Sequence, residues 1–535
     1  YDGQPIIRGV ATFSGPTAPL IILDNFPYEG NLDNINPNDI ASVTVLKDAA
    51  AASIWGARAA NGVIVITTKK ARFGQPLHIA LQSNLSISDK PDLYYYPQMS
   101  SSDFIDVEKE LYSRGHYAST FNHVLKWPVT PVLEMLRKRE TADPASQAEI
   151  DREIDALRSL DVRRDFDRYL YERASHHQYA LTLRGGGEKL SFQALAGYDG
   201  DMSALAAASD RLNLKSGFTF QATTSTRIGY DIQYTQTRRR AGRPGYGGIL
   251  MRTSLHPYAQ LSDDQGVALP IARTYRMSFI EELTATGDFL DWTYVPLEDY
   301  RHIDNQSRTS DVLVNTHLSQ RVLPFLHINA YYQFERQETA GTELSGIGSF
   351  FTRDLINRYT RVADDGSIIR EIPYGDILDR TDQHLRAHQL RLQAVVEKSW
   401  HRHRVNALIA AEGRAIGSTE SIYRTYGYDP DVLTFASVNL KELYPISATG
   451  QRLLIPNRQS FGQTETRFLS FFANGAYQYD SRYGLSFSLR RDASNLFGLR
   501  TNDQWNAFWS VGGLWEVSRE NFYANDALPT LRLRM

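Results

Sequence analysis

The chain has 535 residues, of which 42% are hydrophobic and 22% are charged, and this composition excludes an intrinsically disordered protein. A net charge of −3 provides no basic field, so we expect no nucleic-acid partner. The chain contains no cysteine, which excludes disulfide frameworks, thiolate zinc sites and cysteine nucleophiles.

The length would ordinarily predict several soluble domains, but very large β-barrels break that rule. No apolar run approaches the roughly 18 residues of a membrane-spanning helix, so a membrane-crossing version of this chain would be a barrel. The 30 Tyr and 24 Phe residues could form the aromatic girdles of such a barrel, or the core of a soluble β protein. Because Tyr1 is not a start methionine, we expect the chain to lack its own beginning.

The first seventy residues predict a small mixed unit. Its expected elements are a strand at 19–25, a helical turn capped by Asn36, a strand at 42–46, an alanine-rich helix between Asp48 and Gly56, and a strand at 63–68. The stretch GARAANG has the wrong spacing for a phosphate-binding loop, so the structural interpretation is favoured. We expect a small independent core formed by Val43, Val45, Val63, Val65 and Ile66.

From residue 75 onward the pattern changes to paired strands with a period of two. Leu485, Phe487 and Leu489 fall on one face of a strand, with serines between them. The same layout predicts hairpins that join 179–183 to 190–198, 212–220 to 228–234, 312–318 to 326–334, 390–396 to 405–411, and 467–479 to 483–490. The polar residues on the opposite face would line a wet lumen, and they include Gln193, Lys215, Asp231, Gln333, Glu335 and Arg391.

Short and long connections alternate along the chain. The predicted tight turns are at 185–188, 222–225, 321–324, 398–402 and 479–482. The predicted long connections are 89–176, 239–307, 339–384 and 416–465. This alternation is typical of outer-membrane barrels, which have short periplasmic turns and long extracellular loops. Tyr198, Tyr234, Tyr332 and Phe334 would then form an aromatic girdle near the long loops.

Two segments carry a resemblance to a known family. The segment INPNDIASVTVLKDAAAASIWGARAANGVIVITTKK, at 35–70, closely resembles the plug of SusC/RagA-type TonB-dependent outer-membrane transporters. The segment RRDASNLFG, at 490–498, and the following WNAFWSVGGLWEVSRENF resemble a strand pair of the barrel of that family.

The resemblance implies a transmembrane antiparallel β-barrel of 22 strands with a mixed α/β plug inside its lumen. We expect residues 1–71 to be the plug, incomplete at its beginning, and residues 72–535 to be roughly the first thirteen strands of the barrel, incomplete at its end. The implied partners are a SusD-like lipoprotein that lids the extracellular mouth, TonB acting through a segment that this chain lacks, and outer-membrane lipid.

Candidate ligand-binding residues lie on the long connections. Aromatic side chains there could stack on sugar rings or bury peptide side chains, and they could equally pack a loop onto its neighbours. The substrate-binding candidates are Tyr94, Tyr95, Tyr96, Trp292, Tyr294 and Tyr300. Arg58 is the candidate for contact between plug and barrel, and the arginines at 238–240 could attract anions or face lipopolysaccharide and water.

The sequence predicts no enzyme. Neither H-E-x-x-H nor G-x-S-x-G is present, and we expect no catalytic residue, metal or cofactor. The predicted function is TonB-dependent import of a nutrient oligomer, an oligosaccharide or a peptide, across the outer membrane. A surface barrel for adhesion and a receptor for a metal chelate or cobalamin are the alternatives.

Overall fold

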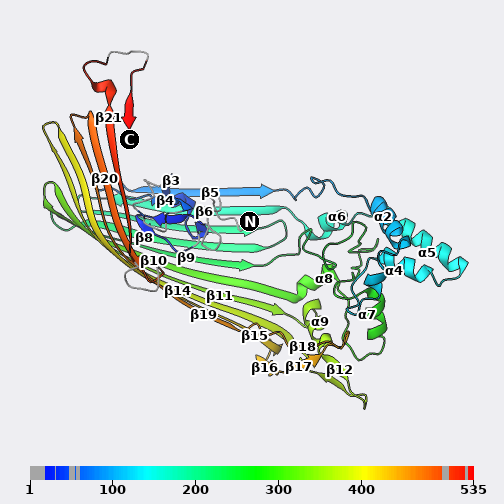
Figure 1. Ribbon diagram of the computed structural model, residues 1–535. Coiled ribbons are helices and arrows are strands. Elements are labelled where there is room, and N and C mark those ends of the chain that lie inside the picture. Colours follow the sequence, from blue (N-terminus) through cyan, green and yellow to red (C-terminus); the bar gives the residue numbers. More distant parts are fainter. Residues whose placement is uncertain are drawn as a thin grey trace.

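The computed structural model describes residues 18–30, 32–46, 55, 59, 61–496, 505–523 and 528–535. Figure 1 shows three parts: a small N-terminal sheet, a long antiparallel sheet, and a group of helices and loops at one end of the long sheet. Tight turns join the strands at the other end of the long sheet. The small sheet lies against the long one.

The small sheet belongs to the N-terminal unit, by which we mean the described residues from 18 to 71. Its strands have the order β2-β1-β4-β3, with β1 parallel to β4 and β3 antiparallel to β4. The bounds are β1 (Leu20–Leu23), β2 (Phe26–Pro27), η1 (Leu32–Asn34), η2 (Pro37–Asp39), β3 (Ile40–Leu46) and β4 (Val63–Thr68). Asn36 caps η2 as predicted, because its side-chain oxygen accepts a hydrogen bond from the backbone nitrogen of Asn38 at 2.9 Å.

The predicted core of this unit is confirmed on β4 and wrong on β3. Val63 and Ile66 on β4 are buried, but Val43 and Val45 on β3 are 53% and 44% exposed. The prediction for β3 was wrong because β3 is an edge strand of the small sheet, and the described residues leave its face uncovered. Most of the predicted alanine-rich helix, together with Arg58, lies outside the described residues.

The long sheet has fourteen strands. They follow one path in the order β22-β21-β20-β19-β15-β14-β11-β10-β9-β8-β7-β6-β5, with β16 paired to β15 beside it, in agreement with the roughly thirteen strands predicted. The bounds along the path are β5 (His78–Ser88), β6 (Ala174–Gly186), β7 (Leu190–Met202), β8 (Ala208–Gln221), β9 (Thr226–Arg240), β10 (Ile303–Leu323), β11 (Leu326–Ser345), β14 (Asp376–Trp400), β15 (His403–Asp429), β19 (Ser460–Tyr479), β20 (Tyr483–Ser494), β21 (Trp505–Glu516) and β22 (Arg532–Arg534).

All five predicted hairpins are confirmed by the strand pairing. All four long connections are shorter than predicted, and the last two most clearly, because β11 runs to Ser345, β14 begins at Asp376 and β15 runs to Asp429. The alternation of apolar and polar residues, on which the prediction depended, ends before these strands do. The strands continue beyond it because hydrogen bonds between strand backbones need no apolar side chains.

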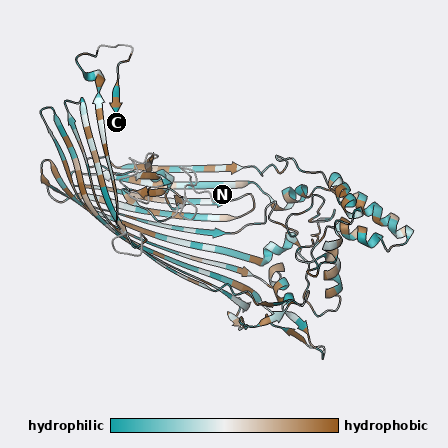
Figure 2. Cartoon of the chain, in the orientation of Figure 1, coloured by the Kyte–Doolittle hydropathy of each residue, from teal (hydrophilic) through white to brown (hydrophobic). Residues whose placement is uncertain are grey.

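The two faces of the long sheet differ in polarity, as Figure 2 shows by the alternating colours along each strand. On the outer face, the apolar side chains of the predicted sets are exposed, for example Leu181, Ile232 and Phe487. On the inner face, which carries the N-terminal unit, Gln193, Lys215, Gln333, Glu335 and Arg391 are buried. The inverted pattern, polar inside and apolar outside, confirms the predicted parity.

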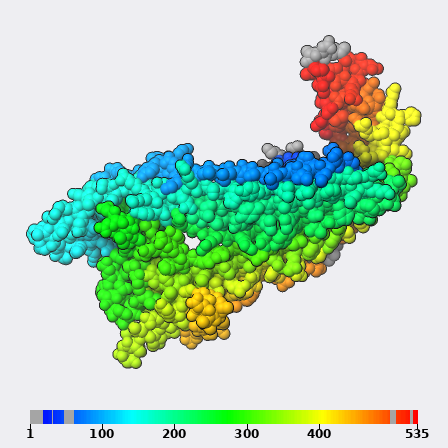
Figure 3. Space-filling model, turned by 180° about the vertical axis from the view of Figure 1, so that it is seen from behind, coloured from blue at the N-terminus to red at the C-terminus, as the bar shows by residue number. Residues whose placement is uncertain are grey.

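The long connections fold into a compact region with its own cores. The view from behind in Figure 3 shows this region as a mass at one end of the sheet. Its elements are α2 (Ser101–Ser113), α3 (Ala118–Phe121), α4 (Pro131–Arg139), α5 (Pro144–Leu157), α6 (Val162–Asp165), η4 (Phe166–Leu170), α7 (Met277–Thr284), α8 (Pro296–Asp299), η5 (Tyr300–His302), α9 (Phe350–Arg358), β12 (Thr360–Val362), β13 (Ile368–Arg370), β16 (Thr434–Ala436), β17 (Leu443–Pro445) and β18 (Arg452–Leu454). A further short turn, η7 (Val517–Arg519), follows β21. None of the helices in the described ranges combines the length and apolar character needed to cross a membrane.

Candidate functional site: the inner face and its plug

A buried ion pair joins the N-terminal unit to the inner face of the long sheet. Lys215 Nζ, on β8, lies 2.6 Å from Asp39 Oδ2 and donates to Thr68 Oγ1 at 2.9 Å. Burial raises the pKa of the Asp39 carboxyl above its ordinary value, and the charge of Lys215 opposes that shift. A buried charge is tolerated only when it is paired, so each of these two residues depends on the other.

Asn34 of the N-terminal unit is held by three neighbouring strands. Its backbone oxygen accepts hydrogen bonds from Asn213 Nδ2 at 3.1 Å and from Thr235 Oγ1 at 3.2 Å. Gln233 Nε2 donates to the same oxygen at 3.3 Å. The side-chain nitrogen of Asn34 donates to Asp311 Oδ2 at 3.3 Å. One residue thus ties the unit to β8, β9 and β10.

Tyr28 combines a polar and an apolar contact with strand β10. Its hydroxyl donates to Asp311 Oδ2 at 2.9 Å, and its ring packs in a cluster with Leu23, Ile64 and the inner-face residue Leu313. Burial, followed by the negative charge of Asp311, raises the pKa of Tyr28 well above its ordinary value. The hydroxyl therefore stays protonated and remains a donor.

Two buried arginines of the inner face contact β2 and the residues that follow it. Arg414 on β15 forms an ion pair with Glu29 and donates to the backbone oxygen of Pro27 at 3.3 Å. The guanidinium of Arg391 on β14 lies 5.3 Å from the centre of the Phe26 ring, which is within the range of a cation–π contact.

The N-terminal unit approaches the backbone of β7 so closely that only glycine fits there. A Cβ atom built on Gly197 would lie 2.3 Å from Asn36 Nδ2, the side chain that caps η2. A methyl group at this position would require the Asn36 side chain, which caps η2, to move. Close approach and many hydrogen bonds therefore act together to hold the unit.

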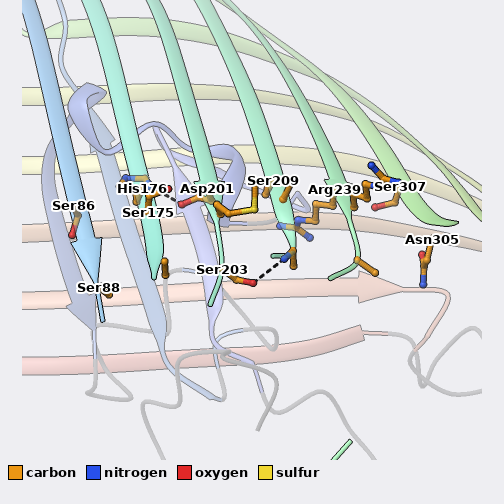
Figure 4. A pocket seen from close by; sticks show the side chains of 16 residues that line it. Ser86, Ser88, Ser175, His176, Asp201, Ser203, Ser209, Arg239, Asn305 and Ser307 are labelled. Atoms are coloured by element: carbon orange, nitrogen blue, oxygen red, sulfur yellow. Dashed lines mark hydrogen bonds and ion pairs between the residues drawn. The ribbon is translucent and has the colours of Figure 1, made fainter. Parts of the chain in front are cut away.

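A cavity of about 580 Å³ opens on the same end of the sheet as the long connections. Figure 4 shows the side chains that line it, with a hydrogen bond between His176 and Asp201. The contact joins His176 Nδ1 to Asp201 Oδ1 at 2.5 Å. Strand register places six of the lining residues in one row across six strands, in the order Ser86, His176, Asp201, Ser209, Arg239 and Ser307.

This row, which we call the rim row, lies on the inner face. Ser209 and Lys215 are both at odd positions of β8, so they share a face. The described residues that line the cavity supply hydroxyl, amide, imidazole and charged groups beside several alanines and Met202, and none of them is Phe, Tyr or Trp. The cavity is suited to hydrogen bonding rather than to stacking.

Comparison with known proteins agrees with this architecture. Residues 1–63 match the family described as TonB-dependent Receptor Plug Domain. The TonB-dependent receptor P39 of Formosa agariphila is 25% identical over 528 residues, which are 97% of this chain and 42% of that protein. The TonB-dependent receptor SusC of Bacteroides thetaiotaomicron is 22% identical over 555 residues, which are 99% of this chain and 46% of that protein.

Among solved structures, the RagAB peptide importer in the open-open state has a TM-score of 0.69 at 19% identity, covering 99% of this chain and 54% of that one. The RagAB peptide transporter gives a TM-score of 0.67 at the same identity, covering 96% of this chain and 53% of that one. These likenesses show the fold.

The chain is similar in sequence and in fold to the SusC/RagA-type TonB-dependent transporters. The N-terminal unit is the plug of this family, and the long sheet is a partial β-barrel of the outer membrane. The chain spans about half the length of the curated relatives it matches.

The predicted substrate-binding aromatics occupy two different environments. Tyr94, Tyr95 and Tyr96 are exposed, and the guanidinium of Arg163 lies 4.0 Å from the centre of the Tyr94 ring. Trp292 and Tyr294 are 0% and 4% exposed, and both lie in the core of the long connections.

Packing of the long connections, the alternative to substrate binding, accounts for this burial. Trp292 Nε1 donates to Asp354 Oδ1 at 2.9 Å, which satisfies its only polar group. Tyr300 is partly buried against the same core. Substrate contact by the exposed group at 94–96, and by Tyr300, stays a prediction.

The sequence did not identify Tyr28, Asn34, Asp311 or Arg414 as docking residues. Strand parity does indicate that Asp311 and Arg414 face inward. An inward-facing charged residue on a barrel strand was therefore the one sequence feature that could have identified them as contacts of the N-terminal unit. Their partners lie hundreds of positions away along the chain, and no local pattern reports such a pairing.

A buried carboxyl group in the long connections was also missed. Glu108 on α2 accepts hydrogen bonds from Thr130 Oγ1 at 2.6 Å and from Tyr258 Oη at 2.5 Å. Burial raises the pKa of Glu108 to about 7, while those hydrogen bonds act in the opposite direction. The ring of His256 stands 4.3 Å from that of Tyr258, and burial lowers the pKa of His256 to about 3.

Proposed function

We propose that the complete protein imports a nutrient oligomer, an oligosaccharide or a peptide, across the outer membrane by TonB-dependent active transport. A SusD-like lipoprotein would close the extracellular mouth, and TonB would act on the plug from the periplasm. In this proposal residues 1–71 are the plug and residues 72–535 are barrel.

The observation that carries the proposal is the chemistry of the plug's attachment. The contacts of Asp39, Asn34 and Glu29 with the inner face are hydrogen bonds and ion pairs. Water can replace such contacts one at a time, whereas strand pairing within the barrel is continuous and cooperative. A pulling force would therefore detach or rearrange the plug before it unfolds the barrel.

The rim row supports a substrate that is an oligomer rich in hydrogen-bonding groups. Serine hydroxyls, the imidazole of His176 and the carboxylate of Asp201 line one continuous band at the mouth of the lumen. Both oligosaccharides and peptide backbones offer matching donors and acceptors. RagAB is described as a peptide importer, and that description is a property of RagAB.

The deciding experiment removes the plug. Deletion of residues 1–71 from the complete protein should leave a barrel that inserts and conducts passively, because a barrel with more than twenty strands has a lumen that side chains cannot fill. Uptake of a large substrate should then no longer depend on TonB. Single-channel conductance in planar bilayers and energised uptake in cells would measure both effects. A correctly inserted deletion variant that stays electrically silent would contradict the proposal.

The two alternatives are tested by different readouts. A surface barrel for adhesion has no need of a removable plug, so it would lose no TonB-dependent uptake on deletion of residues 1–71. A receptor for a metal chelate or cobalamin keeps plug and barrel. It would take up its ligand equally well after the gene for a SusD-like lipoprotein is removed.

A further inference from the structure

Four arginines on the outer face form two pairs across neighbouring strands. Arg238 on β9 stands directly opposite Arg308 on β10. Arg336 on β11 stands directly opposite Arg386 on β14. All four side chains are exposed. We call this group the arginine patch.

Like charges directly opposite each other destabilise an antiparallel sheet. The neighbouring groups compensate only in part: Arg336 forms an ion pair with Glu338, whose carboxylate also lies 3.7 Å from His384 Nδ1. On β11 and β14, two guanidinium groups and His384 therefore share this one carboxylate.

One further carboxylate, that of Asp210, faces the patch. Asp210 stands opposite Arg238, and its carboxylate accepts a hydrogen bond from Tyr198 at 2.6 Å. With the Gln236 amide turned over to suit its neighbours, its oxygen accepts from Arg308 Nη2 at 2.6 Å. Within the described part of the chain, Arg238, Arg308 and Arg386 form no ion pair. The patch keeps an excess of positive charge.

The patch lies at the boundary between the apolar band and the long connections. Phe334 lies two residues from Arg336, and His388 lies two residues from Arg386. Both are on the outer face, on the side of the arginines nearer the tight turns. Beyond them, and beyond Tyr332 on β11, the outer face is aliphatic, with exposed Leu390 and Ile328. Aromatic residues on a barrel mark the membrane interface, so the patch lies at the level of lipid headgroups.

We propose that the arginine patch binds phosphate groups of an anionic glycolipid in the outer leaflet of the outer membrane. Guanidinium groups bind phosphate oxygens in a bidentate manner, and two of them side by side would share one phosphate. Binding would turn each repulsive pair into a bridged one. Arg308 and the position opposite Arg336 are four residues apart on β10, about 13 Å, so each pair would hold its own phosphate.

The proposal rests on the outer-membrane location and on the outward orientation of the long connections, and not on the transported substrate. Failure of the transport experiment would leave it untouched. If the long connections faced the periplasm, the patch would meet phospholipid headgroups of the inner leaflet instead.

The test compares lipids that differ only in phosphate. The complete protein is purified in detergent and titrated with bisphosphorylated lipid A, with dephosphorylated lipid A and with phosphatidylglycerol, and native mass spectrometry counts bound lipid. We expect strong retention of the first only. The variant R238Q/R308Q, and separately R336Q/R386Q, should bind it roughly 30-fold more weakly, since each basic residue near an anionic surface contributes about a fivefold effect. The control R152Q/R164Q removes the same charge from exposed positions of the long connections and should bind as wild type.

Thermal stability provides a second readout, in which the difference between wild type and the paired variants should reverse when the lipid is added. Without phosphate-bearing lipid, each paired variant should be at least as heat-stable as wild type, because the repulsion is gone. With bisphosphorylated lipid A, wild type should gain stability and the variants should not. Equal binding of the two forms of lipid A, or unchanged binding by both paired variants, would overturn the proposal. Preference for phosphatidylglycerol would reassign the patch to the inner leaflet and would also overturn it.

Discussion

Lys215 of the barrel wall and Asp39 of the plug form a buried ion pair with 2.6 Å between Nζ and Oδ2. Lys215→Met would remove the closer of the two cations at the buried Asp39 carboxylate and leave only Arg184, 3.9 Å away. Removing one partner of a buried pair costs about 3 to 5 kcal/mol, so the plug should dock less firmly. We expect increased ion conductance of the complete protein in planar bilayers.

The double variant Asp39→Asn/Lys215→Met removes both charges and should recover part of the lost docking. Lys189→Met, at an exposed position in the turn between β6 and β7, is the matched control and should conduct as wild type. Unchanged conductance of Lys215→Met would show that this pair does not hold the plug.

We expect the barrel to be oriented with its long connections outside and its tight turns in the periplasm. Because the chain has no cysteine, single cysteines can report this directly. Asp264→Cys, at an exposed position in a long connection, should react with an impermeant maleimide on intact cells. Gly187→Cys, at an exposed position of a tight turn, should react only after lysis. The reverse labelling pattern would refute the assignment.

The two faces of β20 should tolerate arginine differently. Phe487 is exposed on the outer face, whereas Ser488 donates to Asn474 Oδ1 at 2.8 Å. Arginine on the lipid-facing side near mid-membrane costs about 2 to 4 kcal/mol, and a lumen position is more permissive. Phe487→Arg should therefore reduce assembly of the complete protein, measured as heat-modifiable mobility on gels, more than Ser488→Arg. Equal tolerance would mean that the faces are wrongly assigned.

The stability of the long connections should depend on the protonation of Glu108. Its pKa is raised from 4.5 to about 7 by burial, so between these values the folded state holds more protons than the unfolded state. Local stability should therefore fall as pH rises from 4.5 to 7 and stay lower above pH 7. The full shift corresponds to roughly 3 kcal/mol.

His256 has the opposite effect on stability. Burial lowers its pKa from 6.5 to about 3, so the stability that neutral His256 contributes to the fold is lost as pH falls from 6.5 to 3. The measurement therefore uses a His256→Gln background. Limited proteolysis between residues 101 and 160 should accelerate from pH 5 to pH 8, and adding Glu108→Gln should abolish this acceleration. An unchanged pH profile in the double variant would exclude Glu108 as its cause.

Much of the barrel was predictable from local patterns alone. A pleated strand sends alternate side chains to opposite faces, so the period of two in Leu485, Phe487 and Leu489 determines which side chains share a face. Tight turns between such strands determine the pairing of neighbours, since adjacent strands joined by a few residues have no other partner within reach. The plug was recognisable because its strands and turns are consecutive in the chain.

The partners of the inner face were decided only by the tertiary structure. Asn34 meets β8, β9 and β10, and Pro27 meets Arg414, because folding brings together residues that are far apart in sequence. Aromatic residues on the long connections, such as Trp292 and Tyr95, have similar local sequence surroundings, yet one is buried and the other is 74% exposed. Burial of such a side chain depends on what packs over it from other segments, and that information is absent from any single stretch of sequence.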